Sequence, residues 1–327
     1  MKVLVTGASG FLGSHVAEQL KEQGHDVRCL VRKSSKTKFL DTLGVEYAYG
    51  AIDDAASLPD AVRGVDAIVH AAGVVKADSE EGFIRVNAEG SRALVAAAEK
   101  HAKGLRRFVH VSTAGVHGPG KPGVRVRASD AMNPVTGYSR SKLEGERRIM
   151  AFADRVPITI LRPPPIYGPR DTEIFKLFQI LSYGMALRFG RAMESVSMIY
   201  GPDAADACIK AITADVPSGT AFLIDDGGAW HFDQLIDEAA KGLGVDPWLR
   251  TSVPEPVFRF AAAASEGVGR LLGKVMIFNR EKANELLIEH FLVHSDDARA
   301  ALGWSPKVQY PEGAKRTADW YRANRWL

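Results

Sequence analysis

Cysteine is scarce in this 327-residue sequence, and long apolar runs are missing from it. The two cysteines, Cys29 and Cys208, each lie inside a short apolar run, which predicts buried thiols in a reducing cytosol. No apolar run approaches the roughly 20 residues that a membrane-spanning helix needs. Met1 leads directly into a strand-like run, which leaves no room for a signal peptide. We therefore expect a cytoplasmic protein, and contact with a membrane is not expected.

An excess of charge of either sign is also missing. Lys and Arg number 42 against 39 Asp and Glu, a net charge of +3, and the basic residues are spread along the chain. This pattern does not predict a nucleic-acid-binding surface, so we expect a small molecule as the main partner. The 46% hydrophobic content and the length are sufficient for a large core in one large domain or two.

The opening of the chain, Lys2 to Gly13 (K-V-L-V-T-G-A-S-G-F-L-G), predicts a strand, a glycine-rich turn and a helix. Gly7 would allow a sharp turn, Gly10 the approach of a pyrophosphate, and Gly13 close packing of the helix on the strand. The start of the helix would offer free N–H groups and partial positive charge to the phosphates. Glycine triplets also occur in tight turns that bind nothing, but the strand and helix around this one favour dinucleotide binding.

The run Asp26 to Val31 predicts a second strand, and Arg32 and Lys33 follow its end. In a dinucleotide-binding fold this end faces the adenosine ribose, where a carboxylate favours NAD and an arginine accommodates the extra phosphate of NADP. The basic pair therefore favours NADP. A solvent-exposed basic turn is the alternative interpretation.

Strand-like runs continue to alternate with helical patterns through the first half of the chain. The further predicted strands are Val45 to Tyr49, Ala67 to His70, Arg107 to Val111 and Val156 to Leu161. A long helical pattern lies between the fourth and fifth strands, from about Ser79 to His101. This alternation predicts an α/β fold: a Rossmann-type, doubly wound parallel sheet with helices on both faces.

Tyr138 and Lys142 are four residues apart in a helical pattern, which places them on one face about one turn apart. An ammonium nearby favours the phenolate and brings the pKa of a tyrosine, near 10 by itself, toward neutral pH. Such a pair suits hydride transfer from a nicotinamide to a carbonyl carbon, with Tyr138 protonating the oxygen. Thr113, at the end of the fifth strand, would hold that oxygen by a hydrogen bond. The same spacing is commonplace on exposed helices, so the catalytic interpretation depends on the dinucleotide-binding pattern that comes first.

Six motifs together resemble the extended short-chain dehydrogenase/reductase family (the NAD-dependent epimerase/dehydratase superfamily), over essentially the whole chain. They are T-G-A-S-G-F-L-G (Thr6 to Gly13), H-A-A (His70 to Ala72), N-A-E-G (Asn87 to Gly90), V-S-T-A-G-V-H-G (Val111 to Gly118), Y-S-R-S-K (Tyr138 to Lys142) and L-R-P-P-P-I-Y-G-P (Leu161 to Pro169). By this resemblance Thr113, Tyr138 and Lys142 take the catalytic positions, and no metal is expected. Many relatives pair through the helices around Asn87 and Tyr138, which implies a homodimer.

The cofactor-binding positions follow from the glycine turn, the strand ends and this resemblance. They are Gly7, Ser9, Gly10, Phe11, Leu12, Arg32, Lys33, Ile52, Asp53, Ala71, Ala72, Gly73, Asn87, Tyr138, Lys142, Pro163 and Ile166. Two alternatives stay open: Asn87 is equally typical of a structural hydrogen-bonding residue, and small residues such as Ala71 also suit an ordinary strand-to-loop turn.

Departures from the family pattern bear on the subclass. Ala51 stands where an acidic residue often contacts adenine, with Asp53 as the alternative contact, and His117 replaces a tyrosine. We interpret His117 as a polar wall of the substrate pocket or a plain loop residue. Pro165 stands where sugar-nucleotide epimerases carry an asparagine that holds the diphosphate.

Two further departures concern residues that sugar-nucleotide enzymes share. Ala114 and Gly115 follow the catalytic hydroxyl, where dehydratases carry acidic residues. Ser195-Val196-Ser197 lacks the basic residue of epimerases. The run from Leu161 to Asp171 is similar to the branch of 3β-hydroxysteroid dehydrogenases and dihydroflavonol reductases, which act on bulky, less polar molecules.

The strict alternation ends after Pro169, which predicts a smaller C-terminal substrate-binding lobe interleaved with returns to the sheet. We place the NAD(P)-binding Rossmann domain at 1–167, with a returning segment at about 198–228, and the lobe at 168–197 and 229–327. The stretch Val257 to Leu272 is the most apolar of the second half and predicts a buried helix. A pocket wall and a membrane-surface contact for a lipid-like substrate are the alternatives.

The sequence thus predicts an NADP-dependent oxidoreductase, with NAD as the alternative cofactor, that interconverts a ketone and a secondary alcohol on a bulky, largely apolar small molecule. One alternative is a sugar-nucleotide 4-epimerase with retained NAD, against which Pro165 and the Arg32-Lys33 pair count. The other is a catalytically silent NADP-sensing protein, which has no need of a Tyr138-Lys142 pair.

Overall fold

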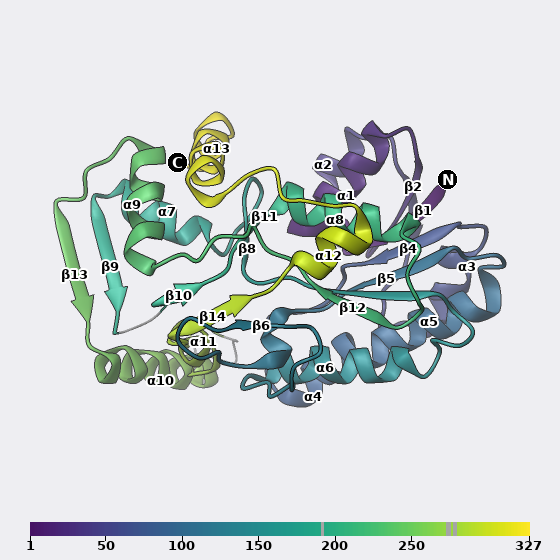
Figure 1. The fold of residues 1–327 in the computed structure, drawn as a ribbon, viewed down its shortest axis with the longest axis horizontal. Helices are drawn as coiled ribbons and strands as arrows, with labels where there is room; N and C mark the ends of the chain where they lie inside the picture. Colours follow the sequence, from purple (N-terminus) through teal and green to yellow (C-terminus); the bar gives the residue numbers. More distant parts are fainter. Residues whose placement is uncertain (191–192, 273–275, 277–279) are drawn as a thin grey trace.

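The computed structural model of the protein describes residues 1–190, 193–272, 276 and 280–327. Figure 1 shows two neighbouring parts, with the N-terminus in one and the C-terminus in the other. Two large hydrophobic cores lie on the two faces of the main sheet, and another lies under the helices of the second part. No helix in the described part of the chain is both long enough and apolar enough to cross a membrane.

The main sheet consists of parallel strands that are rich in valine and isoleucine. They are β1 (Lys2–Thr6), β2 (Asp26–Val31), β3 (Glu46–Tyr49), β4 (Ala67–His70), β5 (Arg107–Val111), β7 (Ile158–Arg162) and β12 (Thr220–Leu223). Their order across the sheet is β12-β7-β5-β4-β1-β2-β3. The inner strands are buried on both faces, as parallel strands usually are. Because β1 lies between β2 and β4, the winding reverses beside β1, and ligands of such sheets bind there at the carboxyl ends of the strands. The predicted Rossmann-type sheet is confirmed.

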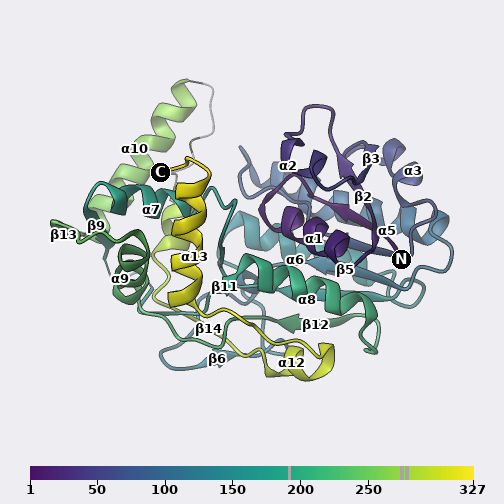
Figure 2. The same cartoon turned by 90° about the horizontal axis from the view of Figure 1, so that it is seen from above.

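Helices cover both faces of this sheet (Figures 1 and 2). They are α1 (Phe11–Glu22), α2 (Lys38–Asp41), α3 (Leu58–Val62), α5 (Gly90–His101), α6 (Gly137–Met150), α8 (Gly201–Thr213) and α12 (Asp296–Leu302), with short 3₁₀ turns at Ala55–Ser57 and Ala114–His117. Leu20 of α1 and Ile209 of α8 pack into the core on one face. Leu94 of α5 and Ile149 of α6 pack into the core on the other face.

The long helix predicted from Ser79 to His101 is present, but its middle is wound differently. It consists of α4 (Glu80–Phe83), a π-helical segment (Ile84–Glu89) and α5. The Oγ of Ser79 caps its start by accepting a hydrogen bond from the N–H of Gly82. The wider π-helical turn contains Asn87, and such turns are frequent at functional sites.

The second part of the molecule combines helices with short parallel strand pairs. Its helices are α7 (Phe175–Ser182), α9 (Phe232–Leu243), α10 (Glu255–Leu271), α11 (Arg280–Leu286) and α13 (Tyr310–Ala323). Its strands are β6 (Arg125–Val126), β8 (Ile166–Tyr167), β9 (Met185–Phe189), β10 (Ser195–Val196), β11 (Ile199–Tyr200), β13 (Leu249–Val253) and β14 (His290–Val293). Strand β14 lies between β10 and β6, which brings three distant segments of the chain side by side. The core beneath them contains the fully buried Tyr167, Tyr310 and Tyr321.

The expectation that Val257 to Leu272 forms a buried helix is wrong in one respect. The stretch is helical, as α10, but Phe260 is 74% exposed and Leu271 is 88% exposed. Phe258 and Ala262 are buried against Ala283 of α11 in a small separate core. Apolar composition predicted the helix correctly, but a helix packed on one face only leaves its other apolar face in solvent.

Candidate active site

The glycine turn between β1 and α1 has the geometry that its spacing predicts. Gly7 has a φ of +74°, and a Cβ added there would lie 2.7 Å from the backbone nitrogen of Ala72. A Cβ at Gly13 would lie 2.6 Å from the carbonyl carbon of Gly7, so α1 and the turn pack too closely for a side chain. Gly10 is the exposed N-cap residue of α1. Among the described residues, a Cβ added at Gly10 would have one neighbour within 4 Å, the backbone oxygen of Gly7 at 3.2 Å. The mouth of the turn is therefore open at Gly10.

A cleft of about 390 Å³ lies beside this turn, between the two parts of the molecule. Nine of the predicted site residues line it: Phe11, Leu12, Ala71, Gly73, Thr113, Tyr138, Lys142, Pro163 and Ile166. They come from the start of α1, the loops after β4, β5 and β7, the strand β8 and the first turns of α6. The remaining predicted residues, which do not line the cleft, are Gly7, Ser9, Gly10, Arg32, Lys33, Ile52, Asp53, Ala72 and Asn87.

Lys142 is buried beneath the cleft and is 4% exposed. Its Nζ donates a hydrogen bond of 2.6 Å to the backbone oxygen of Val111, at the end of β5. Burial is the largest influence on this ammonium and lowers its pKa to about 8, while the carboxylate of Glu146 acts in the opposite direction. A Cβ added at Gly73 would lie 3.9 Å from the same Nζ, so the small residues after β4 give the ammonium access to the cleft.

Tyr138 stands half-buried in the first turn of α6, one turn before Lys142. The helix begins cleanly because the Oγ1 of Thr136 accepts a hydrogen bond of 3.1 Å from the N–H of Ser139. On the cleft's other side, the Oγ1 of Thr113 accepts a hydrogen bond of 3.1 Å from the N–H of Gly115. That contact uses the hydroxyl oxygen as acceptor and leaves the hydroxyl proton of Thr113 for donation into the cleft.

Asn87 holds the loop that follows β4. Its side chain is fully buried, its Oδ1 accepts from the N–H of Val74 at 2.8 Å, and its Nδ2 donates to the oxygen of Val74 at 3.0 Å. The same Nδ2 donates to the Oγ of Ser141 on α6 at 2.9 Å. The amide therefore ties the loop at Gly73 to α6. This contact fits the structural interpretation of Asn87, with any effect on a cofactor exerted through the loop.

Two fully buried histidines lie behind Lys142 on adjacent strands. The ring of His70 is 5.2 Å from that of His110, and its nitrogens contact the Oγ1 of Thr6 at 2.7 Å and the Oγ of Ser91 at 2.8 Å. Burial, followed by the charge of Lys142, lowers the pKa of His70 to about 3, and burial likewise lowers the pKa of His110. Both rings are thus neutral, which leaves Lys142 as the cation facing the cleft from this cluster.

The basic pair after β2 is exposed at the carboxyl end of the sheet. Among the described residues neither the Arg32 guanidinium nor the Lys33 ammonium forms an ion pair, and the N–H of Arg32 donates to the Oγ of Ser35. Asp53 is exposed after β3, whereas Ile52 is buried against the side of Gly90. These residues lie at the strand ends that flank the glycine turn, away from the cleft with Tyr138.

The two interpretations of His117 both fail, because this side chain is neither in the cleft nor in an ordinary loop. It is 6% exposed, and its Nε2 lies 3.1 Å from a guanidinium nitrogen of Arg162. Because a guanidinium only donates, Nε2 accepts and Nδ1 carries the proton toward the oxygen of Ala131. Arg162 also forms a buried ion pair of 2.7 Å with Glu146, one helical turn after Lys142. His117 is part of this buried network behind the active-site helix.

The second part of the molecule supplies an apolar wall of the cleft, whose residues the sequence did not identify. Its side chains are Ile174, Met193, Val196, Leu286, Ile288 and Phe291, with the carboxyl groups of Asp171 and Glu173 at one side. Glu173 forms an ion pair of 2.7 Å with Lys76, which joins the two parts across the cleft. This wall depends on the pairing of β14 with β10 and β6, which no motif in the sequence revealed.

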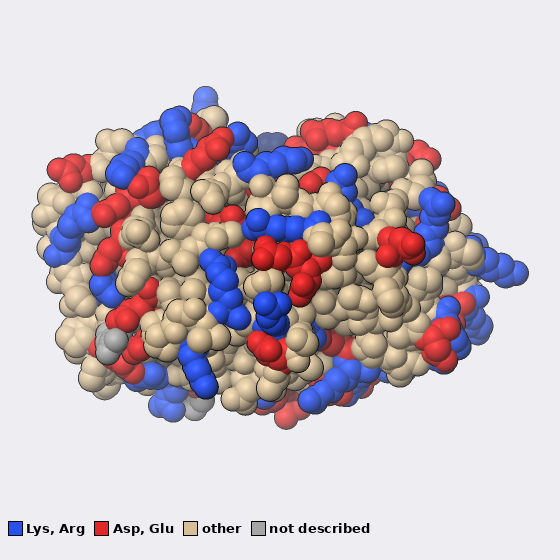
Figure 3. All heavy atoms as spheres, viewed as in Figure 1, with Lys and Arg blue, Asp and Glu red and all other residues tan. Residues whose placement is uncertain are grey.

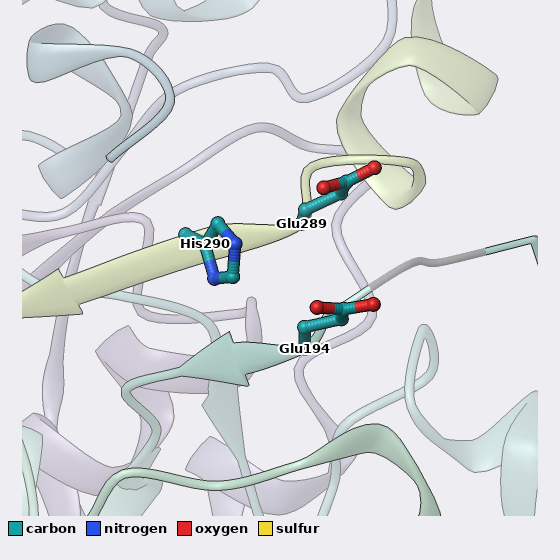
Figure 4. Close-up of side chains that lie close together, drawn as sticks. All are labelled: Glu194, Glu289 and His290. Carbon is teal, nitrogen blue, oxygen red and sulfur yellow. The ribbon is translucent and has the colours of Figure 1, made fainter. Parts of the chain in front are cut away.

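Glu194, Glu289 and His290 form a group of metal-binding residue types near this wall, at the start of β10 and β14 (Figure 4). One ligand atom from each lies within 4.8 Å of the others, and the Nδ1 of His290 also lies 2.9 Å from the Oγ of Ser195. Partly exposed acidic groups are common without a metal, so we assign none.

Over the face shown in Figure 3, Lys and Arg residues alternate with Asp and Glu residues.

The comparisons with known proteins agree with this geometry. The model of the "NAD dependent epimerase/dehydratase family" matches residues 3–224. A ceramide reductase from Caulobacter vibrioides is 34% identical over 328 residues, which cover 99% of this chain and 96% of the relative. The chain belongs to the NAD dependent epimerase/dehydratase family. It is therefore an NAD(P)-dependent oxidoreductase of the extended short-chain dehydrogenase/reductase type.

Other proteins that are similar to this chain differ in what their names say they do. A 4-hydroxy-2-methyl-3-oxo-4-farnesyl-3,4-dihydroquinoline-1-oxide ketoreductase from Stigmatella aurantiaca is 27% identical and covers 96% of this chain and 94% of its own. The crystal structure of a UDP-glucose 4-epimerase from Thermotoga maritima has a TM-score of 0.81 at 22% identity, over 99% of this chain and all of that one. At this identity the match shows a common fold.

Proposed function

We propose that this oxidoreductase uses NADP to interconvert a ketone and a secondary alcohol on a bulky, largely apolar small molecule. The observation that carries the proposal is the cleft, in which Thr113, Tyr138 and Lys142 face a wall of apolar side chains. A volume of about 390 Å³ suits an organic molecule of moderate size. The ceramide reductase and farnesyl-quinoline ketoreductase relatives, whose names describe apolar substrates, support the same class of substrate.

The described residues fit a nicotinamide dinucleotide. Gly10 leaves the N-terminus of α1 open to a pyrophosphate, and the unpaired N–H groups of that helix start favour anions. The exposed Arg32 and Lys33 supply positive charge where the adenosine ribose of such a cofactor is bound, which favours NADP over NAD. From there the turn leads to Phe11 and Leu12 and into the cleft, where Gly73 and Pro163 leave room beside Tyr138.

The chemistry that a bound nicotinamide supplies is hydride transfer to or from the substrate carbon. In the direction of reduction, the phenol of Tyr138 donates its proton to the carbonyl oxygen, and the hydroxyl of Thr113 donates a hydrogen bond to the same oxygen. The buried ammonium of Lys142 stabilises the phenolate that remains, until a proton from solvent restores the phenol. The apolar wall excludes water around the substrate, which strengthens these interactions.

A sugar-nucleotide 4-epimerase with retained NAD is the second candidate, since epimerases share the fold. Two observations count against it. Pro165, which lines the cleft, has no side-chain donor for a diphosphate, and Val196 of the Ser195-Val196-Ser197 run contributes an apolar side chain to the same cleft. The homodimer and the cytoplasmic location expected from the sequence stay predictions, and light scattering of the purified protein tests the first.

Identifying the cofactor in the purified protein separates the two candidates. The protein is denatured, the released nucleotide is identified, and the affinities of the empty protein for NADPH and NADH are then measured. We expect no stoichiometric NAD and tighter binding of NADPH. Arg32→Ala combined with Lys33→Ala should weaken NADPH binding by about tenfold or more and leave NADH nearly unchanged. Stoichiometric NAD, or an equal effect on both cofactors, would contradict the proposal.

A further inference from the structure

The outer face of α10 carries an apolar stripe in solvent. Its members are Val257 (55% exposed), Phe260 (74%), Val268 (49%), Leu271 (88%) and Leu272 (62%). Spacings of three, eight and three residues place Val257, Phe260, Val268 and Leu271 on one side of a helix. Figure 2 shows α10 extending away from the body of the molecule, and the exposed fractions place these side chains in solvent. Soluble proteins rarely expose so many large apolar side chains together without a partner.

Arg259 and Glu255 of α10 do not interrupt this stripe. The guanidinium of Arg259 donates to the Oε1 of Glu255 at 2.7 Å on the same helix, and to the Oδ1 of Asn284 on α11 at 2.6 Å. These contacts direct the guanidinium of Arg259 toward α11 and leave the outward side apolar. A protein partner would normally meet a polar rim around such a patch.

The inner face of the same helix pair leads to the cleft. Phe258 and Ala262 of α10 pack against Ala283 of α11, and Leu286 is partly buried against this small core. Leu286, together with Ile288 just beyond α11, lines the cleft. The helix pair α10–α11 therefore has the exposed stripe on its outside and part of the cleft wall on its inside.

We propose that the outer face of α10 rests on the surface of a lipid bilayer, so that an apolar substrate passes from the bilayer into the cleft beside Leu286. This inference rests on the proposed function for its substrate class. A bilayer can cover an apolar stripe without a complementary surface, because its acyl chains adapt to the side chains. An apolar substrate that fits the cleft also partitions into the bilayer and is concentrated in it. The few basic residues on α10 predict reversible binding rather than a permanent anchor.

A second copy of this chain is the main competing occupant, and the area argues against it. Two copies paired through this stripe alone would bury on the order of 1,000 Å² in total, less than the roughly 1,200–2,000 Å² of a stable protein interface. The stripe is thus too small to hold a dimer by itself, whereas partial insertion into lipid requires no further contact.

Vesicle flotation tests the inference. The intact protein is mixed with phosphatidylcholine vesicles, with and without phosphatidylglycerol, and the floated fraction is compared with that of Phe260→Ser combined with Leu271→Ser. Val124→Ser, which changes an exposed valine outside α10, is the matched control. We expect the wild type and the control to float, and the double variant to lose more than about tenfold in binding. Its melting temperature and its turnover of a short, water-soluble ketone should stay unchanged, while turnover of a long-chain ketone embedded in vesicles falls.

The possible outcomes are distinguishable. Equal flotation of the wild type and the double variant, or no flotation of the wild type, would overturn the inference. Dimerisation of the wild type without lipid that is lost in the double variant, as seen by light scattering, would assign the stripe to a second copy instead. Flotation that depends on the stripe, in a protein that reduces no ketone with either cofactor, would leave the docking surface in place and reject the proposed function.

Discussion

Replacing Lys142 by methionine should make the protein more stable and inactive. Burial lowers the pKa of this lysine from 10.5 to about 8, a change of about 2.5 units that corresponds to about 3 kcal/mol against folding at neutral pH. Methionine has a similar length and no charge, so this cost disappears. The variant loses the charge-assisted hydrogen bond from Nζ to the oxygen of Val111, worth about 2 kcal/mol. The expected net gain is therefore about 1 kcal/mol.

The pH dependence of this gain has a definite sign. Below about pH 8 the lysine is protonated in both the folded and the unfolded wild-type protein, so the full cost of the buried charge is present. Between about pH 8 and 10.5 the folded state releases the proton while the unfolded state keeps it, and the stability of the wild type rises relative to the variant. The advantage of methionine should therefore be largest below about pH 8 and be lost before pH 10.5, above which the wild type, with its hydrogen bond to Val111, is the more stable protein.

Urea unfolding of both proteins, without cofactor, at several pH values between about 7 and 10 measures this difference. Lys103→Met, which removes an exposed lysine, is the matched control and should change stability by less than about 0.5 kcal/mol. For a chain of 327 residues the gain corresponds to about 1.5 °C in melting temperature. A Lys142→Met protein that is less stable at neutral pH, or a difference that does not shrink with rising pH, would refute the reasoning.

Three further predictions concern the same site. Gly13→Ala should lower the free energy of unfolding by more than about 3 kcal/mol, because the new Cβ meets the backbone of Gly7. Gly267→Ala on α10, where an added Cβ has no neighbour within 4 Å among the described residues, should be neutral or stabilising. Equal effects of the two substitutions in urea unfolding would contradict this. Glu146→Gln should cost about 3 kcal/mol, because it leaves Arg162 buried without its ion pair, and a loss below about 1 kcal/mol would show that the pair is unimportant. The kcat/KM of ketone reduction should fall as pH rises through about 8, since Lys142 loses its charge there, and this limb should move to lower pH in Glu146→Gln; an unmoved limb would point to another group.

The sequence predicted what depends on neighbours close along the chain. The glycine turn, the ends of β2 and β4, and the Tyr138–Lys142 spacing are set by a few consecutive residues, and the structure has the turn and helix where these patterns place them. The cleft wall from Leu286 to Phe291 could not be predicted, because it depends on β14 pairing with β10 and β6, about 95 and 165 residues away. His117 was misread for the same reason, since its burial depends on Arg162.

Exposure was harder to predict than helix formation. The sequence pattern from Val257 to Leu272 is the same for a helix that packs against the protein on one face and for a helix that packs on both faces. In the structure α11 packs against one face, and the other face stays in solvent. Composition alone therefore favoured a buried helix, and the structure instead exposes a surface that calls for a partner.

In the proposed function, Tyr138 protonates a ketone that receives its hydride from a bound nicotinamide. Reduction of an apolar ketone with NADPH that carries deuterium at both C4 positions of the nicotinamide tests this proposal directly, in the wild type and in Tyr138→Phe. We predict one deuterium on the carbinol carbon of the wild-type product. The phenylalanine variant should lose about 10²- to 10⁴-fold in kcat and bind NADPH as before. A variant with full turnover would contradict the role of Tyr138, and an alcohol without deuterium would contradict hydride transfer from the nicotinamide.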